Sequence, residues 1–151
     1  MTEPRRVKAG VVGCGDISLN AYFPYVSEIF DLVATCDRIE ERAKEMARLW
    51  GAKEYYADMD DMLANADIEA VFNLTSMASH ASLSLKAAQA GKHFLVQKPF
   101  ATDLDEGLAV VKAAREAGVK GLVEPNDWMN PVSLKAKEII EEGHIGTVHY
   151  V

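Results

Sequence analysis

Short apolar runs alternate along the chain with longer stretches of helical periodicity. The apolar runs cover residues 7–12, 32–36, 54–57, 69–74, 94–96 and 121–124. Most of them are nearly continuous, which is typical of strands buried on both faces of a parallel sheet. Between them, apolar residues recur at spacings of three and four, the pattern of amphipathic helices. The chain is therefore predicted to be an α/β protein with a doubly wound parallel sheet in three αβα layers.

Two of the predicted helices contain residues that indicate where the helix begins, ends or is interrupted. The helix over residues 104–117 has a capping signal at 102–105 and a glycine stop at Gly118. The helical segment 17–30 contains Pro24, which is expected to kink it or split it in two. The apolar spacing of the 104–117 helix predicts a buried face made of Leu104, Leu108, Val111 and Ala114.

Composition and charge narrow the classes of function. The 151 residues are 49% hydrophobic and carry a formal charge of -7, which argues against a nucleic-acid or membrane-surface binder, since both need a basic face. No apolar run reaches the roughly 18 residues of a membrane-spanning helix. The two cysteines, Cys14 and Cys36, are too few for a disulfide framework. We interpret them as buried free thiols and expect a cytoplasmic location.

A glycine-rich turn, GCGDIS, begins at Gly13 between the first predicted strand and helix. Gly13 permits a tight turn, and Gly15 lets the backbone approach a pyrophosphate. The amides of Asp16 and Ile17 then open a helix whose N-terminus favours phosphate. Ser18 stands where the G-x-G-x-x-G fingerprint has its third glycine. The context favours a dinucleotide-binding Rossmann fold, and the alternative is an ordinary strand-to-helix turn.

An acidic residue, Asp37, ends the second predicted strand. Its carboxylate is expected to accept hydrogen bonds from the ribose hydroxyls of an adenosine and to repel a 2′-phosphate, which favours NAD over NADP. Arg38 keeps NADP possible, because a guanidinium can stack on adenine or hold a 2′-phosphate. The alternative for Asp37 is that it only caps the following helix.

Taken in order, several segments resemble the N-terminal NAD(P)-binding domain of the Gfo/Idh/MocA family, named for glucose–fructose oxidoreductase, inositol dehydrogenase and MocA. The most specific is AGKHFLVQKP at residues 90–99. The resemblance spans nearly the whole chain, and it implies an oxidoreductase that uses NAD, with NADP possible, on a CH–OH group of a sugar or polyol. The other segments are GVVGCGDI at 10–17, ATCD at 34–37, DIEAV at 67–71 and GHIG at 143–146.

The family's version of the 90–99 segment ends in Glu-Lys-Pro, which implies a catalytic role for Lys98. The resemblance places this lysine beside the nicotinamide and the substrate hydroxyl, where it can stabilise developing negative charge and help relay a proton. Gln97 replaces the family's glutamate, which removes a negative charge near the ammonium. The alternative for Lys98 is a solvated lysine at a strand end.

Further cofactor contacts are implied by the same resemblance at the ends of later strands. For His80, a local hydrogen bond at a helix start is an equal alternative. No metal site is expected, because the histidines lack ligand spacing. The implied cofactor contacts are Leu74, Thr75, Ser76, His80, Gln97, Lys98 and Asn126.

The predicted organisation is a Rossmann domain over residues 1–126, followed at 127–151 by a crossover helix and the first strand of a truncated substrate domain. The resemblance implies that this second domain contacts the sugar or polyol and that its sheet can support a homo-oligomer. We therefore expect the chain to bind dinucleotide and to lack turnover by itself. The alternatives are a non-catalytic dinucleotide sensor or partner subunit, and another Rossmann binder such as an S-adenosylmethionine-dependent transferase.

Overall fold

A single parallel sheet of six strands organises the computed structural model, which describes residues 5–124 and 130–149. The strand order is β3-β2-β1-β4-β5-β6, and every pairing is parallel. This arrangement confirms the predicted doubly wound sheet. The strands are β1 (Lys8–Val12), β2 (Asp31–Cys36), β3 (Glu54–Tyr56), β4 (Ala70–Asn73), β5 (His93–Val96) and β6 (Gly121–Val123).

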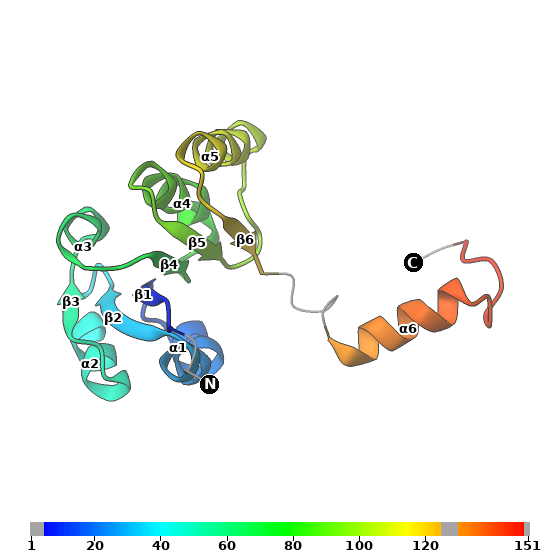
Figure 1. Cartoon of the computed structure of the whole chain (residues 1–151), viewed down its shortest axis with the longest axis horizontal. Helices are drawn as coiled ribbons and strands as arrows, with labels where there is room; N and C mark the ends of the chain where they lie inside the picture. Colours follow the sequence, from blue (N-terminus) through cyan, green and yellow to red (C-terminus); the bar gives the residue numbers. More distant parts are fainter. Residues whose placement is uncertain (1–4, 125–129, 150–151) are drawn as a thin grey trace.

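Helices cover both faces of the sheet, as Figure 1 shows. One face carries the π-helical turn η1 (Ser18–Tyr22), α1 (Phe23–Ile29) and α2 (Glu40–Trp50). The other face carries α3 (Met59–Asn65), the 3₁₀ turn η2 (Met77–Ser79), α4 (His80–Gln89) and α5 (Leu104–Ala117). The result is the three-layer αβα architecture.

The core divides into two apolar clusters, one on each face of the sheet. Neighbouring strand residues supply opposite clusters, since side chains alternate along a strand. Val11 packs with Phe23 and Met46 on the side of α1 and α2. Val12 packs with Met62 on the side of α3 and α4. Burial of these strands on both faces explains their nearly continuous apolar sequence.

The segment after β1 is divided as its proline predicts. A π-helical turn ends at Tyr22, and α1 begins at Phe23 with Pro24 in its first turn. Proline is tolerated there because the first N–H groups of a helix have no partner within the helix. The division brings Tyr22 into the core.

The predicted buried face of α5 is wrong at three of its four residues. The helix buries Gly107 and Val110 instead. A Cβ at Gly107 would come within 3.3 Å of the Ala101 Cβ, so α5 lies close to the segment before it at this position. Of the residues expected inside, Ala114 is partly buried and packs against the core, and three are exposed: Leu104 (75%), Leu108 (55%) and Val111 (37%).

The last helix, α6 (Pro131–Glu141), stands away from the sheet in Figure 1 and buries none of its residues. The strand expected at 147–151 is not formed in its described part, 147–149. A strand needs a neighbour for its hydrogen bonds, and the six-stranded sheet does not include this segment. Its assignment to a second domain stays a prediction. Among the described residues, no helix has the length and apolarity to cross a membrane.

Candidate functional site

A pocket of about 400 Å³ opens where β1, β2 and β4 end. Gly13 follows β1, Asp37 follows β2, and Thr75 and Ser76 follow β4, and all four line the pocket. The strand order reverses between β1 and β4, and open α/β sheets bind ligands at the carboxyl ends of strands beside such a reversal. The fold therefore places the glycine turn and the acid in one crevice.

Glycine occupies positions 13 and 15 of the turn for two different structural reasons. Gly13 has φ +92°, and a Cβ there would meet the carbonyl oxygen of Leu74 at 2.7 Å, so no other residue fits. A Cβ at Gly15 would meet no atom within 4 Å. The backbone at Gly15 is thus open to the pocket, and a side chain would fill space that a ligand can use.

The residues after Gly15 begin the next helical turn. Ser18 is fully buried, and its hydroxyl donates to the carbonyl oxygen of Gly13, which ties the turn to the helix that follows. Asp16 and Ile17 follow Gly15 directly, but their side chains are exposed and do not line the pocket. Only their backbone amides remain as candidate phosphate contacts.

Asp37 holds the glycine turn and the start of α2 in place. One carboxylate oxygen accepts the Cys14 N–H at 2.8 Å, and the other accepts the Ile39 N–H at 2.9 Å. Ile39 is the N-cap residue of α2, and α2 has no side-chain cap hydrogen bond, so the contact between Asp37 and Ile39 fixes the turn before the helix and is not a helix cap. Each carboxylate oxygen keeps a further lone pair, so Asp37 can also accept a ribose hydroxyl.

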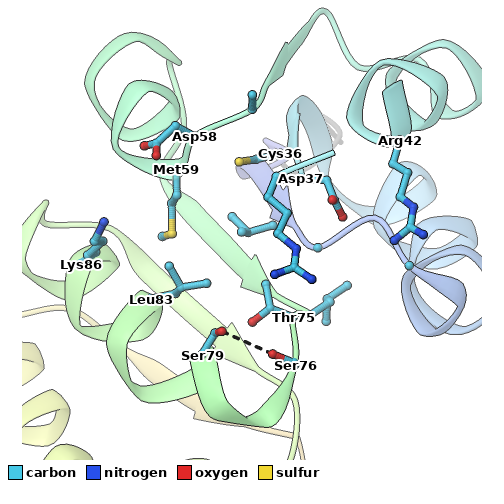
Figure 2. Close-up of a pocket in the computed structure, with 16 residues that line it drawn as sticks. Cys36, Asp37, Arg42, Asp58, Met59, Thr75, Ser76, Ser79, Leu83 and Lys86 are labelled. Atoms are coloured by element: carbon cyan, nitrogen blue, oxygen red, sulfur yellow. Dashed lines mark hydrogen bonds between the residues drawn. The ribbon is translucent and has the colours of Figure 1, made fainter. Parts of the chain in front are cut away.

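Positive side chains surround the pocket on two sides. Arg38 and Arg42 line it near Asp37, and Lys86 lines it from α4. Figure 2 shows Arg42 and Asp37 on one side of the pocket and Lys86 and Asp58 on the other. Lys86 is ion-paired with Asp60, and Asp37 and Asp58 also line the pocket, so the crevice carries charges of both signs, with Arg38 and Arg42 as its cations near Asp37.

Several lining residues on α2, α3 and α4 escaped the sequence analysis. Asp58 had a detectable signal, because it is the N-cap of α3 directly after a strand. Arg42 also had one, since it lies one turn beyond Arg38 at the start of α2. The others had none, because their approach to the pocket depends on helix packing. The missed residues are Arg42, Asp58, Met59, Ser79, Leu83 and Lys86.

The predicted catalytic segment lies at the end of β5. Lys98 is exposed and does not line the pocket. Gln97 is buried, with its side chain directed to Tyr22 and Glu124 rather than to the pocket. Burial raises the pKa of Glu124. The Lys98–Pro99 peptide bond is cis.

His80 links the loop after β4 to the loop after β5. Its ring is buried, with Nδ1 2.6 Å from the carbonyl oxygen of Pro99 and Nε2 3.1 Å from that of Thr75. The Asn73 side chain donates to the backbone oxygen of His80 at 3.0 Å. His80 does not line the pocket, so these contacts favour the local hydrogen-bonding role over direct cofactor contact.

The two cysteines are free and buried beside the pocket. Burial is the main cause that raises the pKa of both Cys14 and Cys36 to about 12. The Cys14 thiol donates to the Cys36 carbonyl oxygen at 3.6 Å. Both thiols therefore stay protonated at neutral pH, which confirms the interpretation of buried free thiols.

The structure thus gathers about half of the predicted site residues. Among the described residues, no group of three or more His, Cys, Asp or Glu side chains is placed to hold a metal ion. Asn126 lies outside the described residues. The predicted site residues that do not line the pocket are Asp16, Ile17, His80, Gln97 and Lys98. The predicted site residues that line it are Gly13, Gly15, Asp37, Arg38, Leu74, Thr75 and Ser76.

Comparison with known families agrees with this geometry. Residues 7–124 match the Gfo/Idh/MocA oxidoreductase family, described by its NAD-binding Rossmann fold. The chain belongs to this family. The residues that match the Gfo/Idh/MocA family run from the residue before β1 to the residue after β6.

Curated Gfo/Idh/MocA relatives include two sugar or polyol dehydrogenases. A D-apiose dehydrogenase of Paraburkholderia graminis is 33% identical, over 97% of this chain and 39% of its own length. The scyllo-inositol 2-dehydrogenase (NAD(+)) of Bacillus subtilis is 29% identical, over 96% of this chain and 43% of its own. The chain thus spans less than half the length of these relatives.

Solved Gfo/Idh/MocA structures contain both forms of the cofactor. The WlbA dehydrogenase from Bordetella pertussis, in complex with NADH and UDP-GlcNAcA, has a TM-score of 0.85 and 33% identity, over 94% of this chain and 44% of that one. A 3-ketoreductase from Actinomadura kijaniata in complex with NADP has a TM-score of 0.87 and 27% identity, over 94% and 46%. The cofactor class of this family is therefore a nicotinamide dinucleotide.

Proposed function

We propose that this chain is the cofactor-binding part of an NAD(P)-dependent dehydrogenase that acts on a CH–OH group of a sugar or polyol. The observation that carries the proposal is the open backbone at Gly15 beside Asp37 in one crevice at the strand ends. The D-apiose and scyllo-inositol dehydrogenases among the relatives support the substrate class.

The pocket residues divide naturally along an extended dinucleotide. The pyrophosphate lies over Gly13 and Gly15, at the amides of Asp16 and Ile17. The adenosine ribose lies at Asp37, which favours NAD. Arg38 and its neighbour Arg42 keep NADP as a second ligand, because two guanidinium groups beside the ribose can hold a 2′-phosphate.

The nicotinamide half extends past Leu74, Thr75 and Ser76 towards the end of β5. Lys98 is the proposed catalytic residue there, and its exposed side chain is free to reach a substrate. When bound, a nicotinamide would supply the hydride acceptor. Lys98 would hydrogen-bond the substrate oxygen, stabilise the negative charge that develops on it and help relay its proton. Asn126 is also proposed to face this half of the cofactor.

The activity of the whole protein is proposed to need more than this chain. Substrate contacts come from a further domain that begins with residues 127–151, and the chain alone binds cofactor without turnover. Self-association through that domain is part of the same proposal. We also propose a cytoplasmic location, since the two thiols in neighbouring strands are free, and a role without nucleic acid or membrane partners, since the chain is acidic.

Calorimetric titration with NADH, NADPH and S-adenosylmethionine tests the cofactor proposal directly. We expect saturable binding of NADH, weaker binding of NADPH because of Asp37, and no binding of S-adenosylmethionine. Tighter binding of NADPH than of NADH would contradict the preference for NAD. A response to neither nicotinamide dinucleotide would contradict the proposed function itself.

A further inference from the structure

A hydrogen-bond network at the end of β5 joins three elements through one buried amide. The side chain of Gln97 is 8% exposed. Its Nε2 donates to the Tyr22 hydroxyl at 2.8 Å and to the Glu124 Oε2 at 2.9 Å. Its Oε1 accepts the backbone N–H of Lys98 at 2.7 Å. The amide therefore connects η1 and the end of β6 to the backbone of the proposed catalytic lysine.

The orientation of this amide follows from its partners. An exchange of its oxygen and nitrogen would set an N–H group against the Lys98 N–H and an oxygen against the Glu124 carboxylate. Both contacts would be repulsive, whereas in the observed orientation both N–H groups and the oxygen are engaged. Gln97 thus needs an acceptor at position 124, and Glu124 supplies it.

Glu124 is held close to Gln97 by the sheet itself. Its backbone N–H donates to the Val96 oxygen at 3.0 Å, which continues the β5–β6 pairing to the residue before Gln97. Within residues 5–124 and 130–149, no lysine or arginine forms an ion pair with the Glu124 carboxylate. Its hydrogen-bond partner in the described structure is the Gln97 amide.

We propose that Glu124 is a positioning residue for Lys98, acting through Gln97. The Gln97–Glu124 pair holds the backbone N–H of Lys98 through the Gln97 oxygen. It contains one carboxylate, at position 124. This inference rests on the proposed function, because the position of Lys98 is measured by the affinity for the nicotinamide half of the dinucleotide, which Lys98 is proposed to contact. It deepens that function by assigning a role to a residue beyond the cofactor pocket.

Exchanging the two side chains separates this role from simple packing. Q97E sets two carboxylates in place of an amide and a carboxylate 2.9 Å apart, where like charges disfavour each other. The double variant Q97E/E124Q restores one amide and one carboxylate in reversed order. In that variant Lys98 N–H can still donate to position 97, and the Tyr22 hydroxyl can donate to the new carboxylate.

The experiment compares affinities for NADH and for ADP-ribose, which lacks the nicotinamide. We expect Q97E to weaken NADH binding by about tenfold, in the range for coupled groups of one network, and to leave ADP-ribose binding unchanged. The exchange variant should recover wild-type NADH affinity. The matched control is E116Q, which removes an exposed carboxylate on α5 and should change neither affinity.

A second measurement reads the network without any cofactor. The side-chain amide NMR resonances of Gln97 should shift with pH as Glu124 ionises, with a midpoint above the ordinary glutamate value of 4.5, and E124Q should abolish the shift. The titratable side chains that contact this amide are Tyr22 from η1 and Glu124 after β6, whereas Lys98 contacts it through its backbone N–H. A residual shift in E124Q over the same pH range would show that a group other than Glu124 titrates, and it would overturn the pairing.

Each outcome has a distinct meaning. If the wild type binds neither ligand, the proposed function fails, and the amide titration still tests the Gln97–Glu124 pair. If it binds both, wild-type NADH affinity in Q97E or failure of the exchange to recover it overturns the positioning role. Equal loss of NADH and ADP-ribose binding in Q97E also overturns the positioning role, because ADP-ribose lacks the nicotinamide. If Q97E does not fold, the exchange variant decides by whether it folds and binds NADH as the wild type does.

Discussion

Individual residues at this site serve the fold and the ligand at the same time. The Asp37 carboxylate accepts two backbone amides and keeps lone pairs for a ribose. Gly13 is required by its backbone angle and by the nearby carbonyl of Leu74, whereas the fold places no atom where a side chain at Gly15 would begin. Gly13 is therefore a structural glycine, and Gly15 is the glycine that a ligand needs.

His80 provides a test of stability at the residue scale. H80A removes a buried ring that contacts the carbonyl oxygens of Pro99 and Thr75. We expect a loss of about 2–4 kcal/mol in the free energy of unfolding, from the cavity and the unpaired carbonyls. Urea unfolding followed by circular dichroism measures it.

The matched control is H144A, at an exposed histidine that contacts Glu142. Its cost should stay below about 0.5 kcal/mol. Equal costs for the two histidine variants would show that the bridge formed by His80 contributes nothing beyond an ordinary surface contact.

At the scale of elements, sequence pattern identifies helices more reliably than the face that they bury. Spacing correctly predicts α5, its cap at Asp103 and its stop at Gly118. The stripe containing Leu108 and the stripe containing Val110 have equal helical spacing. The structure buries the second stripe, with Gly107 close to Ala101, and this packing cannot be read from the spacing of the helix.

Two substitutions on α5 test which stripe is buried. V110A removes methyl groups from a fully buried side chain, and we expect a cost of about 2 kcal/mol. L108A changes a side chain that is 55% exposed, and its effect should stay within about 0.5 kcal/mol. Chemical denaturation of both variants gives the comparison, and a larger cost for L108A would reverse the assignment of the two faces.

Helix packing that no local pattern shows also explains why the sequence did not predict some of the site residues. Gly13, Gly15, Asp37 and the residues after β4 follow strand ends, so the strand order alone brings them together. Lys86 reaches the pocket from the side of a helix, and no local pattern marks that approach. Gln97 was expected at the cofactor, but its burial directs the amide into the core.

At the scale of the whole molecule, the Rossmann fold is a unit that does not depend on α6. The helix buries no residue, and both apolar clusters are built from residues 9–123. We expect a chain ending at residue 129 to keep its unfolding midpoint within about 2 °C of the longer chain, since little buried area is lost. Differential scanning calorimetry measures this midpoint, and a clear drop would place α6 within the folding unit.

The central claim is that the open backbone at Gly15 accepts the pyrophosphate of a nicotinamide dinucleotide. G15V tests it, because a Cβ at position 15 meets no atom of the fold within 4 Å, whereas the added side chain would occupy the position proposed for the ligand. NADH fluorescence titration of the wild type and G15V, with unfolding curves of both, is the decisive measurement. The account predicts saturable binding by the wild type, at least about tenfold weaker binding by G15V, and similar stability. Equal NADH binding by the two proteins would contradict it.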